Sequence, residues 1–538
     1  MYTMPIKSNF LYLFAALVLL LGSACKTAKR KPQRDITINH ETSFNPLFFD
    51  SASMTHFFNI HADLQKFQAQ YIDFYADRNF EYAWFDSTGL SEQAHNFFNL
   101  QNNYINSNED SSLFSAELSG LYHALDRKPV ASILKNPSLL ETELMLTGQF
   151  FKYAAKVYKG ADIDAAELGW FIPRKKIDLS ALLDSMMLKK SSSPDQYAPL
   201  NPQYKALEQF LTKYIELQKR DNGDTIPMLK KALRLGDSTE IIGIIKQRLK
   251  LYETTVTLND GNIYDSAMLL SVRKYQQLLG IAVDGAVGNK MIAELNTPVR
   301  YRVQQLLVNM ERMRWMPAAN DSNYILVNIP EYRMHVFEGG LPAYDMNVIV
   351  GSAANNSVIF NGKLKYIVFS PFWNIPESIV RDEIVPAMRK DPNYIAKHNM
   401  EITGKSGGLP LVRQKPGVKN SLGLVKFLFP NNYSIYLHDT PNRNLFSQSS
   451  RSLSHGCIRL AEPVKFARYL LREDTAVYSH KIIDSLMHLE KEKWVTLKKS
   501  IPVFLVYFTA WVDKNGELNF RKDIYGHDKK MLTKLFNY

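Results

Sequence analysis

The sequence predicts an α+β protein of several domains, in which helical N-terminal regions precede a mostly β C-terminal domain. Three observations predict this fold class. A chain of 538 residues is longer than one hydrophobic core usually serves, so two to four domains are expected. Apolar residues recur at helical spacing in the first 318 residues, whereas from Asn323 onward their period changes to two. The apolar fraction of 46% and the charged fraction of 22% are those of a globular protein.

The first 24 residues are expected to be a signal peptide. An uncharged run from Phe10 to Leu21 follows Lys7, is too short to span a membrane, and precedes the small residues Gly22 to Ala24 and then Cys25. This order is similar to a lipoprotein signal, which implies cleavage before Cys25 and its lipidation. An ordinary secretory leader is the alternative. Either one predicts export to the cell envelope, with a lipid-anchored protein facing the periplasm in the first case. Residues 25–45 are polar and basic, as in a tether.

Residues 46–230 are expected to form a helical domain, in which "YAWFDSTGLS" at Tyr82 and "LMLTGQFFKYAAKVYKG" at Leu144 resemble the scaffold domain of large multidomain enzymes. Leu207, Leu211 and Tyr214, for example, recur at helical spacing. Trp84 and Phe150 could bind glycan, but aromatic residues at helical spacing more often pack in a core.

Residues 231–297 are expected to form a compact three-helix module, and residues 298–318 a connecting helix. The order "VRKYQQLLGIAVDGAVGNKMIAELN" is similar to the type 1 peptidoglycan-binding domain, with a turn at Asp284-Gly285. The resemblance implies a module that contacts glycan or that positions a neighbouring domain.

Residues 319–538 are expected to form the β domain. The segment from Tyr324 to Gly351 predicts a strand, a turn at Gly339-Gly340 and a second strand, and the C-terminal segment predicts a hairpin about Asn515-Gly516. An insert at about residues 377–417 contains a helical segment followed by the glycine-rich Gly404 to Pro410.

The chemistry is expected in the segment "YLHDTPNRNLFSQSSRSLSHGCIRL", Tyr436 to Leu460. His438 ends an apolar, β-favouring run, and Cys457 follows after a polar loop. A thiol needs a nearby base or cation to act as a nucleophile at neutral pH. Gly456 lets the backbone approach a substrate closely, and the amides of residues 455–457 could form an oxyanion hole. These residues predict acyl transfer by a cysteine.

The segment resembles the L,D-transpeptidases, bacterial enzymes that cross-link peptidoglycan, and in particular their large multidomain YcbB type. Similarity extends to "SPFWNIP" at Ser370, "PGVKNSLG" at Pro416 and "SIPVFLVYFTAW" at Ser500. The resemblance implies a β-sandwich catalytic domain, a lid formed by the insert, Cys457 as the nucleophile and His438 as the proton donor and acceptor. It implies further that a peptidoglycan tetrapeptide stem loses its terminal D-alanine, that a diamino-acid amine accepts the acyl group in a 3-3 cross-link, and that carbapenems inhibit the reaction.

Six residues are assigned supporting roles. Tyr436 lies two residues before His438, on the same strand face, and matches a tyrosine that lines the site in the family. A backbone carbonyl near Asp439 is favoured over its carboxylate as the group that orients His438. His455 either handles protons or shapes the loop. Arg459 either holds a substrate carboxylate or forms a structural ion pair, with the ion pair favoured. Trp373 and Asn374 are expected in the wall of the substrate pocket, with core packing as the alternative for Trp373.

Other function classes are less favoured. His438, His455 and Cys457 could bind zinc, but the alternate positions of His455 and Cys457 suit one metal poorly, so neither a metal nor an organic cofactor is expected. A net charge of +12 without a recognition motif does not predict nucleic-acid binding. The expected partners are peptidoglycan stem peptides and glycan, together with a membrane reached through the lipid anchor. Hydrolysis of the same thioester, as in an L,D-carboxypeptidase, and a non-catalytic wall-binding lipoprotein remain alternatives.

Overall fold

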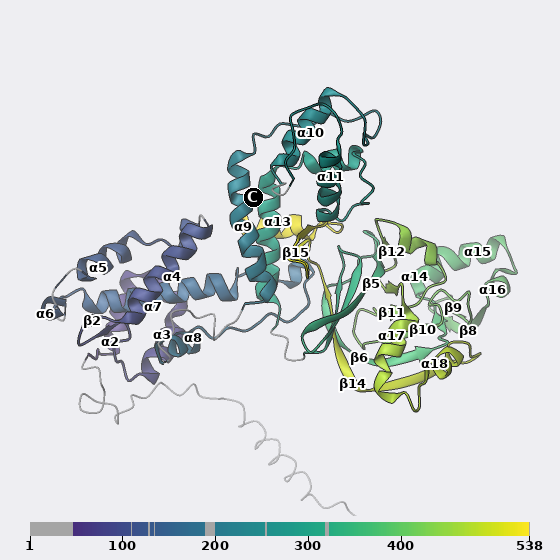
Figure 1. The fold of residues 1–538 in the computed structure, drawn as a ribbon. Helices are drawn as coiled ribbons and strands as arrows, with labels where there is room; N and C mark the ends of the chain where they lie inside the picture. Colours follow the sequence, from purple (N-terminus) through teal and green to yellow (C-terminus); the bar gives the residue numbers. More distant parts are fainter. Residues whose placement is uncertain are drawn as a thin grey trace, which may run out of the picture. The chain divides into compact units, whose positions relative to one another are not determined.

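The computed structural model describes residues 47–108, 110–126, 128, 130–133, 135–188, 200–252, 256–317 and 322–536 (Figure 1). The expected signal peptide, Cys25 and the tether lie outside these residues. Within the described ranges, no helix combines the length and the apolar character that a membrane span requires. The chain divides into two compact units. Of the described residues, the first comprises those within 47–158 and 177–188, and the second those within 159–176 and 200–536.

The first unit is helical and is built around one buried helix. Its elements are α2 (Ala52–Ile60), η1 (Ala62–Phe67), α3 (Gln68–Asp77), β1 (Phe85–Asp86), β2 (Gly89–Leu90), α4 (Glu92–Asn108), η2 (Ser111–Leu113), α5 (Ala116–Asp126), α6 (Val130–Ile133), α7 (Leu139–Ala154) and α8 (Leu179–Leu188). A π-helix, η3 (Ala155–Lys159), continues α7. Side chains on every side of α7 are buried, as expected for a helix that other elements surround.

The aromatic residues that were weighed as glycan contacts lie inside this unit. Trp84 and Phe150 are fully buried. The indole nitrogen of Trp84 donates to Thr147 over 2.8 Å, and its backbone N–H donates to the buried carboxylate of Glu143. These side chains form the core, so they are not available to glycan.

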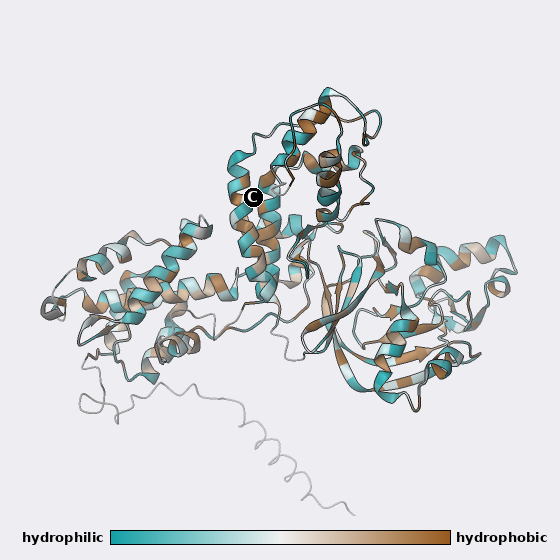
Figure 2. Cartoon of the chain, viewed as in Figure 1, coloured by the Kyte–Doolittle hydropathy of each residue, from teal (hydrophilic) through white to brown (hydrophobic). Residues whose placement is uncertain are grey.

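The second unit begins with helices. They are η4 (Ala166–Leu168), α9 (Pro202–Arg220), α10 (Glu240–Lys250), α11 (Ser266–Leu278), α12 (Asn289–Leu295) and α13 (Val299–Trp315). The expected three-helix module corresponds to α10–α12, and the connecting helix to α13. Asn201 caps α9 by accepting from the N–H of Gln203, and Pro202 occupies the first turn. Apolar residues of these helices and of the sheet belong to one continuous core, as the brown positions along α9 and α13 in Figure 2 illustrate.

The sheet of the second unit has nine strands in the order β12-β5-β13-β11-β10-β6-β14-β3-β4. Strand β4 also pairs with β5, so the sheet closes on itself. The strands are β3 (Tyr324–Asn328), β4 (Arg333–Glu338), β5 (Leu341–Gly351), β6 (Phe360–Phe369), β10 (Val425–Leu428), β11 (Leu437–His438), β12 (Ser452–Ser454), β13 (Ile458–Leu460) and β14 (Lys493–Val506). The fold class is as predicted, a helical N-terminal region followed by a mostly β C-terminal domain.

The extent predicted for one strand was wrong. The segment before Gly339-Gly340 was expected to be a single strand, but it forms the hairpin β3–β4 with a turn at residues 329–332. Pro330 cannot donate to a strand ladder, and Tyr332 adopts a positive φ of 59°. The hairpin expected at Asn515-Gly516 is present as β15 (Ala510–Val512) and β16 (Leu518–Phe520).

The insert has its own small sheet and core. Strands β7 (Trp373–Asn374), β9 (Leu409–Gln414) and β8 (Met400–Ser406) pair in that order, beside α14 (Glu377–Ile379), η6 (Val380–Ile384), α15 (Val385–Lys390) and α16 (Tyr394–Lys397). Buried apolar side chains form a cluster separate from the main core: Ile375, Ile379, Val380, Ile384 and Val412. The insert is therefore a folded element with a core of its own.

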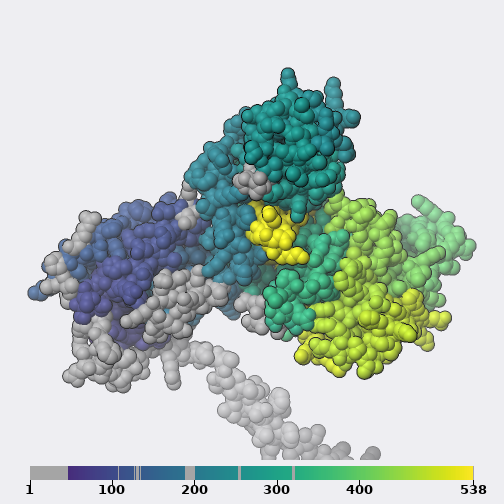
Figure 3. Space-filling view, in the orientation of Figure 1, coloured from purple at the N-terminus to yellow at the C-terminus, as the bar shows by residue number. Residues whose placement is uncertain are grey.

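The remaining helices complete the second unit. They are η7 (Arg443–Ser447), α17 (Pro463–Leu470), η8 (Arg472–Asp474), α18 (His480–Leu486) and α19 (His527–Phe536). Helix α17 starts with Pro463, whose fixed φ suits the first turn of a helix. Helix α19 packs against α13, where the Arg312 and Asp528 side chains form a buried ion pair over 2.5 Å. Figure 3 shows this C-terminal segment in yellow among the teal atoms of the helical region.

Candidate active site

The site is organised by two short parallel strands, β11 and β13. Leu437 pairs with Ile458 and His438 with Arg459, and the N–H of Ile458 donates to the carbonyl of Tyr436 over 3.1 Å. Side chains alternate along a strand, so four of them share one face: Tyr436, His438, Cys457 and Arg459. On the other face Leu437, Ile458 and Leu460 are completely buried. The polar loop between the two segments therefore returns the chain so that thiol and imidazole share one face.

The backbone around Cys457 is held in a tight turn. Gly456 adopts a φ of +110°, which residues with a Cβ rarely adopt. Its N–H donates to the Ser454 hydroxyl over 3.1 Å, and that hydroxyl donates to the Cys457 carbonyl over 2.6 Å. Of the three amides expected to form an oxyanion hole, that of Gly456 is therefore engaged inside the loop.

The thiol of Cys457 is half-buried, and it is the free thiol of the described residues. Its Sγ lies 3.6 Å from the carbonyl oxygen of Ser434, a residue with a positive φ of 56°. Burial raises the pKa of the Cys457 thiol, while hydrogen bonds with Tyr436 and the charge of Arg459 oppose that rise. In the resting site the thiol is therefore protonated at neutral pH.

His438 is buried, and its orientation is fixed from one side. Nδ1 lies 2.5 Å from the carbonyl oxygen of Asp439, and the ring meets the Tyr436 ring edge-on at 5.6 Å between centroids. A carbonyl oxygen only accepts, so Nδ1 carries the hydrogen and Nε2 is left as a proton acceptor. Burial, assisted by the nearby charge of Arg459, lowers the pKa of His438 to about 3. The imidazole is therefore neutral over the physiological pH range.

A buried cysteine–histidine face of this kind fits acyl transfer, and sequence comparison identifies the domain that carries it. Residues 322–478 match the model of the YkuD family, described as the L,D-transpeptidase catalytic domain. Residues 322–478 are an L,D-transpeptidase catalytic domain. Residues 69–211 match the model of a scaffold domain. Its matched range ends within α9, whereas the first compact unit ends before that helix.

A curated relative and two solved structures show similarity of different extent. A Haemophilus influenzae protein provisionally named an L,D-transpeptidase is 34% identical over 244 residues, which are 42% of this chain. This chain spans 49% of that relative's length. The L,D-transpeptidase of Xylanimonas cellulosilytica is 13% identical with a TM-score of 0.18, over 52% of this chain and 100% of that one. The catalytic domain of the E. faecium L,D-transpeptidase acylated by ertapenem is 11% identical with a TM-score of 0.15, over 35% of this chain and 98% of that one.

Asp439 ties down the loop of the transpeptidase domain rather than orienting His438 with its carboxylate. The carboxylate accepts from the N–H groups of Leu424, over 2.9 Å, and Thr440, over 2.6 Å, and it also pairs with Arg443. The group that orients His438 is thus the backbone carbonyl, which is the alternative that the sequence analysis favoured.

Arg459 does not form the structural ion pair that the sequence analysis favoured. Among the residues that the structure describes, no carboxylate forms an ion pair with it, and its Nε has no hydrogen-bond partner. Burial lowers the pKa of Arg459, and the neighbouring thiol opposes this effect. A guanidinium that faces the thiol without a protein counterion is suited to an anionic group of the substrate.

His455 and the expected pocket residues belong to the insert side of the domain. The exposed His455 places Nε2 3.5 Å from the Glu383 carboxylate on η6. Trp373 is half-buried against the apolar core of the insert, and Asn374 is exposed beside it. His455 and Trp373 thus contact the insert through their side chains, and Asn374 pairs with Arg413 in its sheet.

Two side chains that the sequence analysis missed, those of Ser357 and Tyr525, form hydrogen bonds that support the loop that carries Cys457. The Ser357 hydroxyl accepts from the N–H of Gly351 over 2.9 Å and donates to the carbonyl of Gly456 over 2.6 Å. The Tyr525 hydroxyl donates to the carbonyl of Gly351 over 2.6 Å. From the sequence, Ser357 was assigned no role in the site. Nothing in the sequence indicated Tyr525.

Proposed function

We propose that this protein is a cysteine-dependent L,D-transpeptidase in which Cys457 is the nucleophile and His438 the base. It cleaves the bond between the third residue and the terminal D-alanine of a peptidoglycan tetrapeptide stem. It then transfers the acyl group to the side-chain amine of a diamino acid in another stem, which forms a 3-3 cross-link. The observation that supports this most directly is the common face of β11 and β13, where a neutral imidazole that is oriented through Nδ1 accompanies the thiol.

The first step forms a thioester. Both groups are neutral at rest, so the thiol loses its proton to His438 Nε2 as Sγ attacks the carbonyl carbon of the third residue. The tetrahedral oxyanion collapses and expels the amine of D-alanine, which takes the proton from the imidazolium. Arg459 stabilises the negative charge that develops at the sulfur, since it is the cation that acts on the thiol.

The second step releases the product. The acceptor amine attacks the thioester carbonyl and gives a proton to His438, and the departing sulfur of Cys457 recovers a proton from the imidazolium. An amide forms and the C–S bond breaks. Water in place of the amine yields the free acid, which is L,D-carboxypeptidase activity on the same thioester. The two reactions use the same residues and differ in the acceptor.

Mass analysis of muropeptides tests this proposal. Purified protein is incubated with sacculi rich in tetrapeptide stems, beside the Cys457→Ala variant. Dimers with 3-3 links that depend on Cys457 are expected. Tripeptides without dimers would instead assign the carboxypeptidase. Products that are the same with and without Cys457 would refute the proposed nucleophile and favour a wall-binding protein without catalysis.

We also propose that the α10–α12 module contacts peptidoglycan. A cavity of about 430 Å³ lies where the module meets α9 and the β15–β16 hairpin. Its lining includes four aromatic rings, two cations and two carboxylates: Phe210, Tyr214, Tyr252, Tyr275, Lys213, Lys274, Asp513 and Glu517. Aromatic rings and polar groups in one cavity suit a sugar. Loss of sacculus binding in Lys213→Ala and Lys274→Ala, with acylation of Cys457 unchanged, is the expected result. Binding equal to the parent protein would refute this role.

The same function implies a position at the cell envelope. We propose that Cys25 is the lipidated first residue of the exported protein. Its support is the sequence of the first 25 residues.

A further inference from the structure

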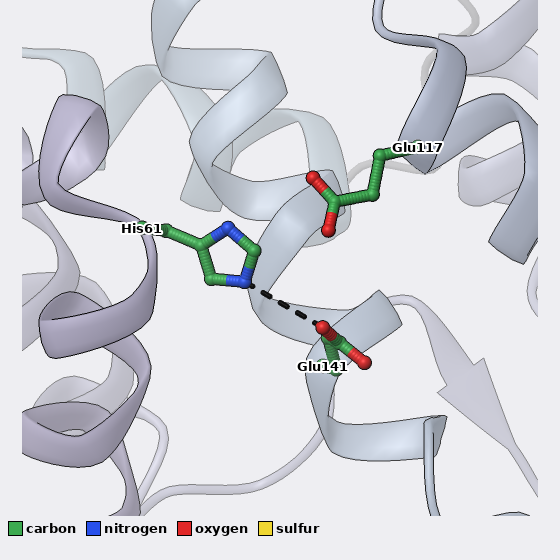
Figure 4. Close-up of side chains that lie close together, drawn as sticks. All are labelled: His61, Glu117 and Glu141. Atoms are coloured by element: carbon green, nitrogen blue, oxygen red, sulfur yellow. Dashed lines mark ion pairs between the residues drawn. The ribbon is translucent and has the colours of Figure 1, made fainter.

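The first unit brings together a histidine and two glutamates that are far apart in the sequence. His61 joins the end of α2 to η1, Glu117 lies in the first turn of α5, and Glu141 lies in the first turn of α7. One ligand atom from each of these side chains can be chosen so that all three atoms lie within 4.8 Å of one another. Figure 4 shows the imidazole directing Nε2 at the carboxylate of Glu141.

The imidazole of His61 is held in place and lacks a hydrogen bond at this nitrogen. The residue is 7% exposed, and its Nε2 is buried without a hydrogen-bond partner. Its backbone is fixed, because its N–H donates to Phe57 and its carbonyl accepts from Leu64. The Phe57 ring lies 4.5 Å from the imidazole. Buried polar atoms usually have a partner, so a nitrogen that faces the Glu141 carboxylate without a hydrogen bond, with Glu117 close by, points to a ligand.

The distance between His61 and Glu141 fits a shared metal ion better than a direct bond. His61 Nε2 lies 3.6 Å from Glu141 Oε1, whereas a charge-assisted N–H···O bond measures about 2.7–2.9 Å. Zinc binds histidine nitrogen and carboxylate oxygen at about 2.0–2.2 Å, so two ligands of one tetrahedral ion lie about 3.3–3.6 Å apart. The separation of the two atoms is thus close to that of neighbouring ligands in one coordination sphere.

We propose that His61, Glu117 and Glu141 bind a divalent first-row metal ion, with Zn²⁺ as the expected occupant. One imidazole and two carboxylates are ligands that Zn²⁺ accepts, and the exposed side of Glu117 leaves room for water as the fourth ligand. The ion joins the α2–η1 segment to the N-terminal turns of α5 and α7, so its role is to stabilise the helical unit. The site is independent of the acyl-transfer chemistry.

Equilibrium dialysis against Zn²⁺ tests the site. The full chain is prepared with Cys457→Ala, so that the thiol binds no metal, and without a polyhistidine tag. About one Zn²⁺ per chain is expected, as in mononuclear sites. Glu117→Gln and Glu141→Gln should each weaken binding about 100-fold, since even outer-shell losses cost about 10- to 100-fold. Glu92→Gln, an exposed glutamate in the first turn of α4, is the matched control and should bind as the parent does.

Two further measurements distinguish loss of the metal site from misfolding of a variant. Saturating Zn²⁺ should raise the melting temperature of the parent and of Glu92→Gln, but not of Glu117→Gln, whose exposed side chain is dispensable for packing. Co²⁺ should give an absorption band in the parent that is lost in Glu141→Gln. Absence of bound Zn²⁺ in the parent would overturn the proposal. So would Zn²⁺ affinity in Glu117→Gln and Glu141→Gln equal to that of the Glu92→Gln control.

Discussion

Acylation of Cys457 should depend little on pH between 5 and 7, and this follows from the burial of His438. The pKa of the imidazole is about 3, so its neutral form predominates throughout this range. At pH 5 a histidine with the ordinary pKa of 6.5 is only about 3% neutral, whereas one with a pKa near 3 is about 99% neutral. The two cases differ about 30-fold in the amount of competent base. The acidic limb of the profile should therefore lie near pH 3.

The assay is the second-order rate of acylation by a carbapenem, followed by intact-protein mass. A carbapenem is the probe of the first half-reaction, because the proposed function implies that this class of inhibitor acylates Cys457. A rate change below about threefold from pH 5 to pH 7 is expected if the base stays neutral. The variant His455→Ala is the matched control: its exposed imidazole lies in the same loop, and its removal should leave the shape of the profile unchanged.

Two results would refute the reasoning in different ways. A rate that falls about 25-fold from pH 7 to pH 5 with a midpoint near 6.5 would mean that His438 titrates as an ordinary exposed histidine. A rate that rises about tenfold per pH unit would mean that a preformed thiolate attacks without the imidazole, because the thiolate fraction grows in that proportion below the thiol pKa.

Four further predictions concern separate parts of the chain. Cys457→Ala should abolish acylation and His438→Ala should lower it by orders of magnitude, with partial recovery as pH rises toward about 8.5. The losses should not add in the double variant, as intact-protein mass can show. Arg459→Ala should lower kcat/KM on tetrapeptide substrate about 10- to 100-fold, since it removes a charge-assisted contact, and Arg459→Lys should restore part of it. Trp84→Ala should lower the free energy of unfolding by about 3–5 kcal/mol in urea denaturation, because it empties a fully buried site. Cys25→Ala should release the exported protein from membranes, and its retention there after a high-salt wash would exclude a lipid anchor.

The sequence by itself determined the class of the fold and the nature of the chemistry. Hydrophobic periodicity separated the helical regions from the β domain because periods of 3.6 and 2 are properties of short segments. Cys457 and His438 could be found because they share a short motif in which the histidine ends a β-favouring run and a glycine precedes the cysteine. The backbone carbonyl that orients His438 could be anticipated as well, since the side chain of Asp439 diverges from that of its neighbour along the chain.

Only the tertiary structure decided the electrostatics of the site and the contacts that hold it. The low pKa of His438 comes from burial by strands distant in the sequence, and the lack of a counterion beside Arg459 is a property of the assembled face. The Ser357 hydroxyl donates to the carbonyl of Gly456, which lies 99 residues away in the sequence. His61 likewise lies beside Glu141, which is distant from it in the sequence. Burial and such long-range contacts depend on how segments with no local relation pack together, so no local pattern encodes them.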